Sequence, residues 1–324
     1  MTATILKMPS ARIVVNKLGN AAPRMELLII CDPYTTSNAE PLALAAQEVG
    51  ASFSIIEISA GAHHGQQLAP PVAAAMKASD LIIAPTRRNI AHTQARRDAQ
   101  QAGAKVICLP EADNENFFLA AGWDADFDTL RSKIDGLAAA FTRASTARVT
   151  SKLGTDITMS IKGRNGRSLN GFANTNDISC GYCLEASLAP VEGTANGRIV
   201  VNASIPGIGL IGAEPVSIEV KNGFAVSIEG GPEAVKFRNL LASFNDPNVY
   251  NLGELGIGMN PMCSLDGTMC SDESVWGGVQ LALGTSAYIG GTCKAAAHYD
   301  TIVTDATLEL DGRIVFEGTD LRLH

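Results

Sequence analysis

The chain has 324 residues, of which 46% are hydrophobic and 18% are charged, a composition typical of ordinary globular proteins. Its formal net charge of −8 argues against nucleic-acid binding, because such binding depends on clustered Lys and Arg. No apolar run reaches the roughly 20 residues of a membrane span, and the opening residues MTATILKMPSARIVV lack the pattern of a secretory signal. We therefore expect a cytoplasmic protein without nucleic-acid or membrane partners.

A chain of this length exceeds the usual size of a single hydrophobic core, so two domains are expected. The first half alternates short apolar runs with amphipathic stretches, which indicates successive strand–helix units. The expected strands are 25–31, 52–58, 81–84 and 105–109, and the expected helices are 38–49, 69–78, 92–103 and 127–146. These elements predict an α/β, Rossmann-like domain with a parallel sheet over residues 1–148.

A parallel sheet of this type places ligands beyond the carboxyl ends of its strands. The loops after Cys31, Ala84 and Leu109 would therefore border any cleft. No G-x-G-x-x-G motif follows the first strand, and the segment Cys31–Thr35 is poorly suited to hold phosphates. A dinucleotide cofactor is disfavoured.

The second half, residues 149–324, carries the pattern of an α+β domain rich in antiparallel strands. Asn-Gly and Asp-Gly pairs, which favour tight hairpin turns, occur in the segments 194–204, 219–230 and 308–318. One helix is expected at 232–243. Glycine is frequent here and marks bulges or close backbone approach.

The seven cysteines are an odd number spread over a long chain, which predicts reduced thiols rather than a disulfide framework. Cys180 and Cys183 have the spacing of a redox or zinc motif, but no second pair accompanies them. Small buried or surface cysteines are the simpler interpretation.

The residues whose type and spacing suggest metal chemistry lie near the chain end. His298 and Asp300 are two residues apart in GGTCKAAAHYDTIV, which reads as a buried strand, so both side chains would point to one face. Glu254 stands in a Gly-rich apolar segment where a lone carboxylate is costly. A shared metal ion would explain all three residues. A structural His–Asp hydrogen bond would explain the pair alone.

One imidazole and two carboxylates suit Fe(II), Mn(II) or Zn(II). Glu185 precedes a turn and could be a fourth ligand, a partner of the ligands or a general base. The acids Asp272 and Glu273 are interpreted as structural, capping a helix or turn.

His92 follows the third expected strand, at a position from which a loop could reach a cleft. A histidine there could transfer protons near neutral pH. The alternative is a residue at a helix start, with Thr93 as the cap. No serine-nucleophile, P-loop or HExxH motif is present.

In order along the second half, the segments 185–190, 195–197, 254–261, 272–273, 281–284, 290–291 and 298–300 resemble the aminopeptidase T group of metallopeptidases. The resemblance implies an α/β domain followed by a metal-binding domain. Those peptidases carry a histidine before the Ala-Leu-Gly motif that helps to hold a second metal, whereas this chain has Val279 and Gln280 there. A binuclear peptidase centre is therefore disfavoured.

A branch of the same fold, the 2,5-dihydroxypyridine 5,6-dioxygenase type, is similar in lacking that histidine. The resemblance implies one Fe(II), a His-x-Asp pair matching His298 and Asp300, and a first-domain histidine matching His92. It also implies a histidine ligand where this chain keeps Glu254, so the chain is intermediate between the two groups.

We predict an enzyme with one divalent metal ion, preferably Fe(II) with Zn(II) or Mn(II) as alternatives, held by Glu254, His298 and Asp300. Glu185 and His92 are the expected catalytic groups. The favoured reaction is dioxygenase opening of a small hydroxylated N-heterocyclic ring. Metal-dependent hydrolysis of an amide or peptide bond is the alternative, and a non-catalytic small-molecule binding protein is a third. A homo-oligomer is compatible with the sequence.

Overall fold

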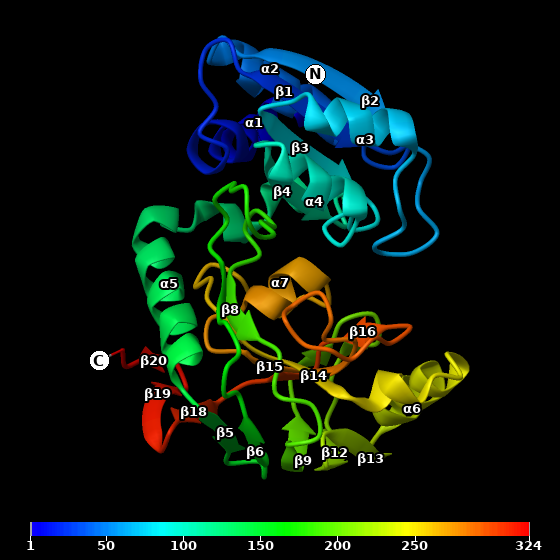
Figure 1. The fold of residues 1–324 in the computed structure, drawn as a ribbon, viewed down its shortest axis with the longest axis vertical. Helices are drawn as coiled ribbons and strands as arrows, with labels where there is room; N and C mark the ends of the chain where they lie inside the picture. The colour runs from blue at the N-terminus through cyan, green and yellow to red at the C-terminus, as the bar shows by residue number, and fades with distance from the viewer. Residues whose placement is uncertain (1, 324) are drawn as a thin grey trace. The chain divides into compact units, whose positions relative to one another are not determined.

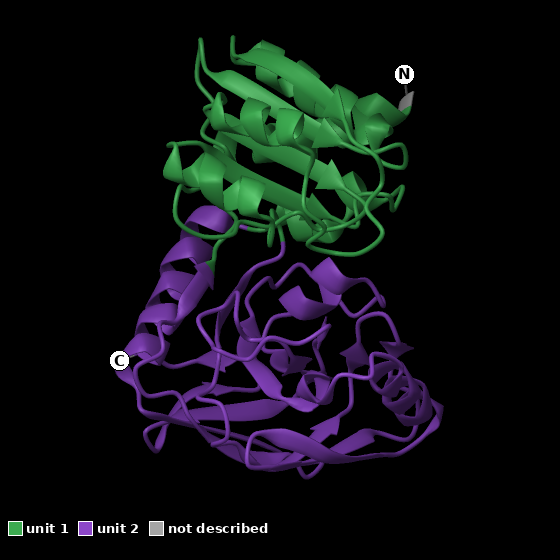
Figure 2. Ribbon diagram, turned by 45° about the vertical axis from the view of Figure 1, so that its right-hand side comes forward, with its two compact units in different colours: residues 1–125, 169–182 green, residues 126–168, 183–324 purple. Residues whose placement is uncertain are grey.

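The computed structural model describes residues 2–323. Contacts divide the chain into two compact units, shown in different colours in Figure 2. The first contains the chain up to Ala125 together with Leu169–Tyr182, and the second contains Asp126–Ser168 and the chain from Cys183 onward. The residues around the predicted boundary at 148 belong to the second unit, and the boundary itself stays a prediction.

The first unit is built on a four-stranded parallel sheet with the order β2-β1-β3-β4. Its strands are β1 (Glu26–Cys31), β2 (Ser52–Glu57), β3 (Leu81–Thr86) and β4 (Lys105–Pro110). Its helices are α1 (Thr2–Arg12), α2 (Thr36–Glu48), α3 (Pro70–Lys77) and α4 (Gln94–Gln101), with a π-helical turn at Ile13–Leu18 and short 3₁₀ turns at Phe117–Leu119 and Ala121–Asp124. The apolar runs of β1, β3 and β4 are buried, which confirms the predicted α/β architecture (Figure 1).

The second unit contains two eight-stranded sheets rich in antiparallel pairs, among them β5–β6, β5–β18, β9–β12 and β14–β15. One has the order β13-β12-β9-β6-β5-β18-β19-β20, and the other has β11-β10-β17-β15-β14-β8-β7 with β16 paired to β15. The strands of the first are β5 (Thr146–Ser151), β6 (Asp156–Ser160), β9 (Asn196–Val201), β12 (Val216–Lys221), β13 (Phe224–Glu229), β18 (Ala306–Leu310), β19 (Arg313–Glu317) and β20 (Asp320–Leu321). Those of the second are β7 (Arg167–Leu169), β8 (Glu185–Leu188), β10 (Ser204–Ile205), β11 (Gly209–Leu210), β14 (Leu252–Gly258), β15 (Val279–Gly284), β16 (His298–Tyr299) and β17 (Ile302–Val303). The helices are α5 (Phe127–Arg143), α6 (Pro232–Ser243) and α7 (Met269–Ser274), with a 3₁₀ turn at Pro247–Tyr250.

Two of the three predicted hairpin turns are confirmed. Asn222–Gly223 joins β12 to β13 and Asp311–Gly312 joins β18 to β19, each with the two positive φ angles that a type I′ turn requires. The third prediction is wrong, because Asn196–Gly197 begins strand β9. There Gly197, with φ 135°, passes so close to β6 that a Cβ atom would lie 2.1 Å from the Asp156 carbonyl oxygen.

The Asp311 side chain anchors the start of β5. Its carboxylate accepts hydrogen bonds from the Ser145 and Thr146 amides and the Thr146 hydroxyl, and these hold its pKa below the ordinary value. A carboxylate with a lowered pKa stabilises the fold above its unfolded pKa, and that contribution disappears as the pH falls through the folded value. Asp311→Asn is therefore expected to lower the melting temperature at pH 7 and to change it less at pH 3. Thermal unfolding at both pH values checks this, and an equal loss at both would contradict it.

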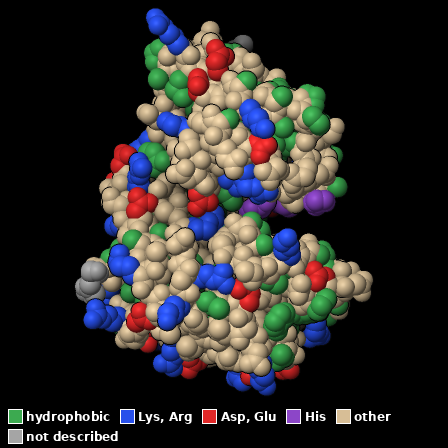
Figure 3. All heavy atoms as spheres, in the orientation of Figure 1, with side chains coloured by type: hydrophobic (Ala, Val, Ile, Leu, Met, Phe, Trp, Pro, Cys, Tyr) green, Lys and Arg blue, Asp and Glu red, His purple; other side chains and the backbone are tan. Residues whose placement is uncertain are grey.

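The state of the cysteines, the apolar length of the helices and the distribution of surface charge also bear on the predictions made from the sequence. All seven cysteines are free. No described helix combines the length and apolar character of a membrane span. Basic and acidic side chains are interspersed over the face seen in Figure 3.

Candidate metal centre

The candidate centre lies on one face of the sheet that contains β8, β14 and β15. Side chains alternate between the two faces of a strand. In the register, Gly256 of β14 pairs with Ser187 of β8 and with Gln280 of β15. Glu254, Ser187 and Gln280 therefore share a face, and Glu185 joins them because it lies two residues before Ser187. All four side chains are buried.

His298 belongs to β16, and the pairing of β16 with the end of β15 places its side chain at this site. Its Nε2 is 3.1 Å from Glu254 Oε2 and 3.6 Å from Asp300 Oδ2. Ligand atoms from these three residues all lie within 4.8 Å of one another. The close partner of the imidazole is thus Glu254 rather than Asp300, and a simple His–Asp hydrogen bond does not describe the cluster.

The other ring nitrogen of His298, Nδ1, also has a hydrogen-bond partner. Nδ1 lies 2.9 Å from the Thr285 carbonyl oxygen, which can only accept a hydrogen bond, so Nδ1 carries the proton. A histidine fixed in this way presents Nε2 to a metal ion, and such outer hydrogen bonds are usual for metal-ligating histidines.

The charges of the three residues are strongly linked. Burial alone would lower the pKa of His298, but Asp300 and Glu254 outweigh it and raise that pKa to about 9. Burial raises the pKa of Glu254, yet its contact with His298 leaves it below the ordinary value. Burial also raises the pKa of Asp300 to about 6, with Glu254 adding to the rise and His298 opposing it.

Two more carboxyl groups belong to the same cluster. Glu185 accepts a hydrogen bond of 3.0 Å from the Ser187 hydroxyl, and burial together with Glu254 and Asp300 raises its pKa to about 8. Burial and then Asp300 raise the pKa of Glu273 well above its usual range, and the two carboxyl groups are hydrogen-bonded. The interpretation of Glu273 as a capping residue is therefore wrong.

Its neighbour Asp272 is structural, as predicted. The Asp272 carboxylate accepts hydrogen bonds from the amides of Asp266 and Gly267, which lie in the loop before α7. Successive residues on a short helix point in different directions, and here only the second of the two acids faces the site.

The predicted strand around His298 is also corrected. Only His298–Tyr299 and Ile302–Val303 pair in the sheet, while residues 290–297 form a loop. Small residues made the segment look like a buried strand. In the fold Gly290 takes a positive φ of 95°, and Gly291 packs closely against Ser286.

Two site residues were not predicted from the sequence. Arg167 of β7 lowers the pKa of both Glu185 and Glu254, so its guanidinium is close to the carboxylates. Tyr288 packs its ring edge against His298, with centroids 5.3 Å apart. Burial and then Glu254 raise the pKa of Tyr288 well above its usual range, so its phenol keeps its proton. Neither residue belongs to a recognisable motif.

The donor set fits a divalent metal ion. Buried carboxylates are normally paired or bound to metal, and this cluster has four carboxyl groups against one imidazole and one guanidinium. One imidazole nitrogen and two carboxylate oxygens that converge within 4.8 Å suit Fe(II), Mn(II) or Zn(II). The residues predicted as ligands are thus brought together.

His92 belongs to the first unit, where it lies two residues before the start of α4 at Gln94. Thr93 caps that helix by accepting a hydrogen bond from the Arg96 amide, in agreement with the capping interpretation. The His92 carbonyl accepts a hydrogen bond from Arg97. The acid–base role of His92 stays a prediction.

Two solved structures share this fold. The 2,5-dihydroxypyridine dioxygenase of Pseudomonas putida KT2440 superposes with a TM-score of 0.85 over 99% of this chain and 98% of that one, at 20% identity. Wild-type AmpT from Thermus thermophilus gives a TM-score of 0.66 over 98% and 99%, at 14% identity. The chain therefore has the fold class that this dioxygenase and AmpT share.

Within this fold class, the sequence identifies the family to which the chain belongs. A sequence model of the 2,5-dihydroxypyridine 5,6-dioxygenase family matches residues 17–322, and the chain belongs to that family. A curated relative, the 2,5-dihydroxypyridine 5,6-dioxygenase of Pseudomonas putida KT2440, is 30% identical over 118 residues, a segment that spans 33% of each protein. Membership of this family confirms the predicted resemblance to the dioxygenase branch rather than to the peptidase branch.

Proposed function

We propose that this chain is a mononuclear metal-dependent dioxygenase that opens the ring of a dihydroxylated pyridine. The observation that carries the proposal is the convergence of Glu254, His298 and Asp300 in a chain of this family. These three residues would hold the ion. When bound, a redox-active ion such as Fe(II) would mediate electron transfer from the aromatic ring to O₂, both atoms of which enter the opened product.

The other side chains have roles that follow from their charge. In its ionised form, which the positive charge of a bound metal ion would favour, Glu185 accepts a proton from a substrate hydroxyl. Burial raises its pKa to about 8, and a pKa near the working pH suits a general base. Tyr288 stays protonated and donates a hydrogen bond to an oxygen of the substrate. Arg167 offsets the negative charge of the cluster and favours an anionic ring. His92 is proposed as the acid–base group of the first unit.

Oxygen uptake tests this function directly. Protein purified without O₂ and loaded with Fe(II) should consume O₂ when 2,5-dihydroxypyridine is added, with loss of the ring absorbance. Protein loaded with Zn(II) should not, because zinc has no accessible redox change. Cleavage of an amide substrate by the zinc form, without O₂ uptake by the iron form, would overturn the proposal in favour of hydrolysis. If the protein binds the substrate but shows neither oxygen uptake nor hydrolysis, it is a binding protein.

A further inference from the structure

The loop between β15 and β16 connects directly to His298. It runs over residues 285–297, and its two ends are joined because the Thr285 amide donates to the Ala297 carbonyl at 2.9 Å. Thr285 also supplies the carbonyl that accepts from His298 Nδ1. Tyr288, which contacts the His298 ring, lies within the same loop. The shape of this loop therefore sets two of the contacts that orient the imidazole.

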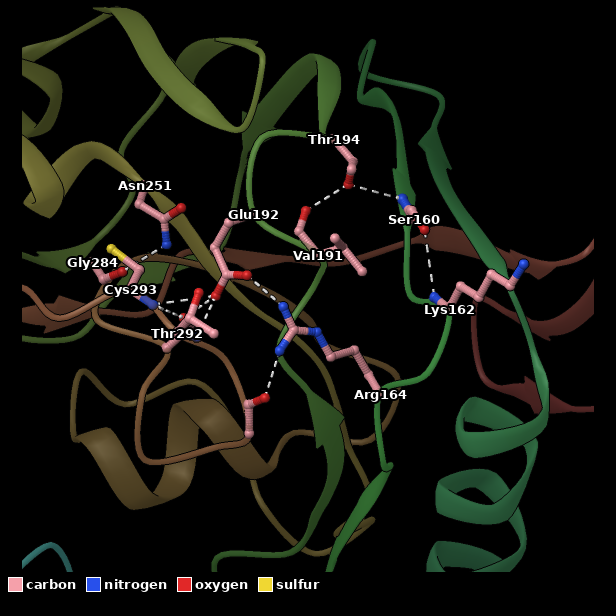
Figure 4. A network of polar contacts seen from close by, with 12 residues as sticks. Ser160, Lys162, Arg164, Val191, Glu192, Thr194, Asn251, Gly284, Thr292 and Cys293 are labelled. Atoms are coloured by element: carbon pink, nitrogen blue, oxygen red, sulfur yellow. Dashed lines mark hydrogen bonds and ion pairs between the residues drawn. The ribbon is translucent and has the colours of Figure 1, made fainter.

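A single carboxylate lies at the centre of the loop. Glu192 Oε1 accepts hydrogen bonds from the Ser286 hydroxyl at 2.7 Å, the Thr292 amide at 2.6 Å and the Cys293 amide at 3.3 Å. Arg164 forms an ion pair with the other oxygen and also donates to the Gly290 carbonyl (Figure 4). The pair thus binds both halves of the loop.

The loop packs closely around this pair. A Cβ atom at Gly291 would lie 2.1 Å from Ser286 Oγ and 2.7 Å from Glu192 Oε1, so only glycine fits there. The side chains of Arg164 and Glu192 are only 14% and 22% exposed. Burial raises the pKa of Glu192, but the Thr292 amide, the Ser286 hydroxyl and Arg164 outweigh it and lower that pKa to about 2. The carboxylate is therefore charged at any physiological pH.

We propose that the Arg164–Glu192 ion pair is a positioning device for the metal ligand His298. Neither residue is part of the carboxylate cluster. The pair acts by fixing the loop 285–297, which holds the Thr285 carbonyl on Nδ1 and Tyr288 on the ring. This inference rests on the proposed metal centre, and it concerns residues that carry no chemistry of their own.

The decisive variant is Glu192→Gln, which keeps the size of the side chain but removes its charge. The matched control is Asp156→Asn, which breaks the Arg148–Asp156 ion pair of 2.9 Å on β5 and β6 of the same unit, away from the loop. Three measurements are made on each protein: anaerobic titration with Mn(II), the NMR signal of the His298 Nδ1 proton, and steady-state oxygen uptake by the Fe(II) form. Thermal unfolding verifies that each variant is folded.

For Glu192→Gln, Mn(II) affinity is expected to fall roughly 10- to 100-fold, the usual effect of losing an outer partner of a metal ligand. The His298 proton signal should shift or broaden, and kcat should fall more than KM rises. Asp156→Asn should leave all of these unchanged. The double variant Glu192→Gln with Arg164→Met should lose no more than the worse single variant, because the two residues act as a unit.

The inference would be overturned if the Glu192→Gln variant folds and its metal affinity and His298 signal are both unchanged. If that variant does not fold, Ser286→Ala removes only one of the hydrogen bonds and should produce a smaller change in the same direction. The NMR signal needs neither metal nor substrate. A perturbed signal in a protein without oxygenase activity would therefore support the positioning role while refuting the proposed reaction.

Discussion

His298→Ala is expected to abolish tight metal binding and, with it, oxygen uptake. The change removes the only nitrogen ligand of the cluster and leaves Glu254 without its partner at 3.1 Å. Metal affinity should fall by more than the roughly 100-fold upper range seen for outer partners of ligands. Removing one member of a buried ion pair also costs about 3–5 kcal/mol in the free energy of unfolding. Anaerobic metal titration and urea unfolding measure the two effects.

A suitable control is His63→Ala, which removes an exposed imidazole from the first unit. It should change neither metal affinity nor stability measurably. Tight one-to-one metal binding that survives in His298→Ala would show that the ion binds elsewhere. It would remove the basis of the proposed centre.

The second large effect is expected for Glu185→Gln. The amide is neutral, like the carboxyl group of the metal-free protein, which a pKa of about 8 keeps largely protonated, and it can still accept a hydrogen bond from Ser187. The fold should therefore be retained. Because the amide cannot take a proton, kcat should fall by about 10²- to 10⁴-fold, the usual contribution of a general base. Steady-state oxygen uptake and metal titration on the same preparation measure both quantities.

Ser187→Ala tests the hydrogen bond to Glu185 separately from its carboxyl group. It removes the hydrogen bond but leaves the carboxyl group, so we expect a loss of roughly 1 kcal/mol in stability and a small change in kcat. If Glu185→Gln instead loses the metal, with kcat restored at saturating metal, Glu185 is a ligand and not a base.

Much of the fold could be predicted because local pattern and tertiary structure agree. The buried strands of the first unit are apolar runs, and helix 232–243 was predicted with the bounds that α6 has. The helix α1 was missed because its sequence, TATILKMPSAR, has weak periodicity and contains Pro9. At Gly197 the Asn-Gly pair predicted a turn, but the glycine is instead needed because the backbone of β6 passes too close for a Cβ atom.

The site was partly predictable for a similar reason. Glu254, His298 and Asp300 stand out because charged groups are rare in such apolar segments. Glu273, Arg167 and Tyr288 come from a helix, an edge strand and a loop. Their proximity to the cluster depends on the order of strands in the sheet, which local spacing does not encode. The role of Gly290 and Gly291 became visible only with the loop around Glu192.

Gln280 has a consequence for the evolution of this fold. Its Nε2 donates to the Glu273 carbonyl, and its Oε1 is buried with no hydrogen-bond partner among residues 2–323. The side chain has room only because position 256 is glycine, where a Cβ atom would lie 2.4 Å from that oxygen. Codons for glutamine and histidine differ by one nucleotide. An imidazole at this position, which would add a nitrogen donor on the face that carries Glu185 and Glu254, is thus a single mutational step away.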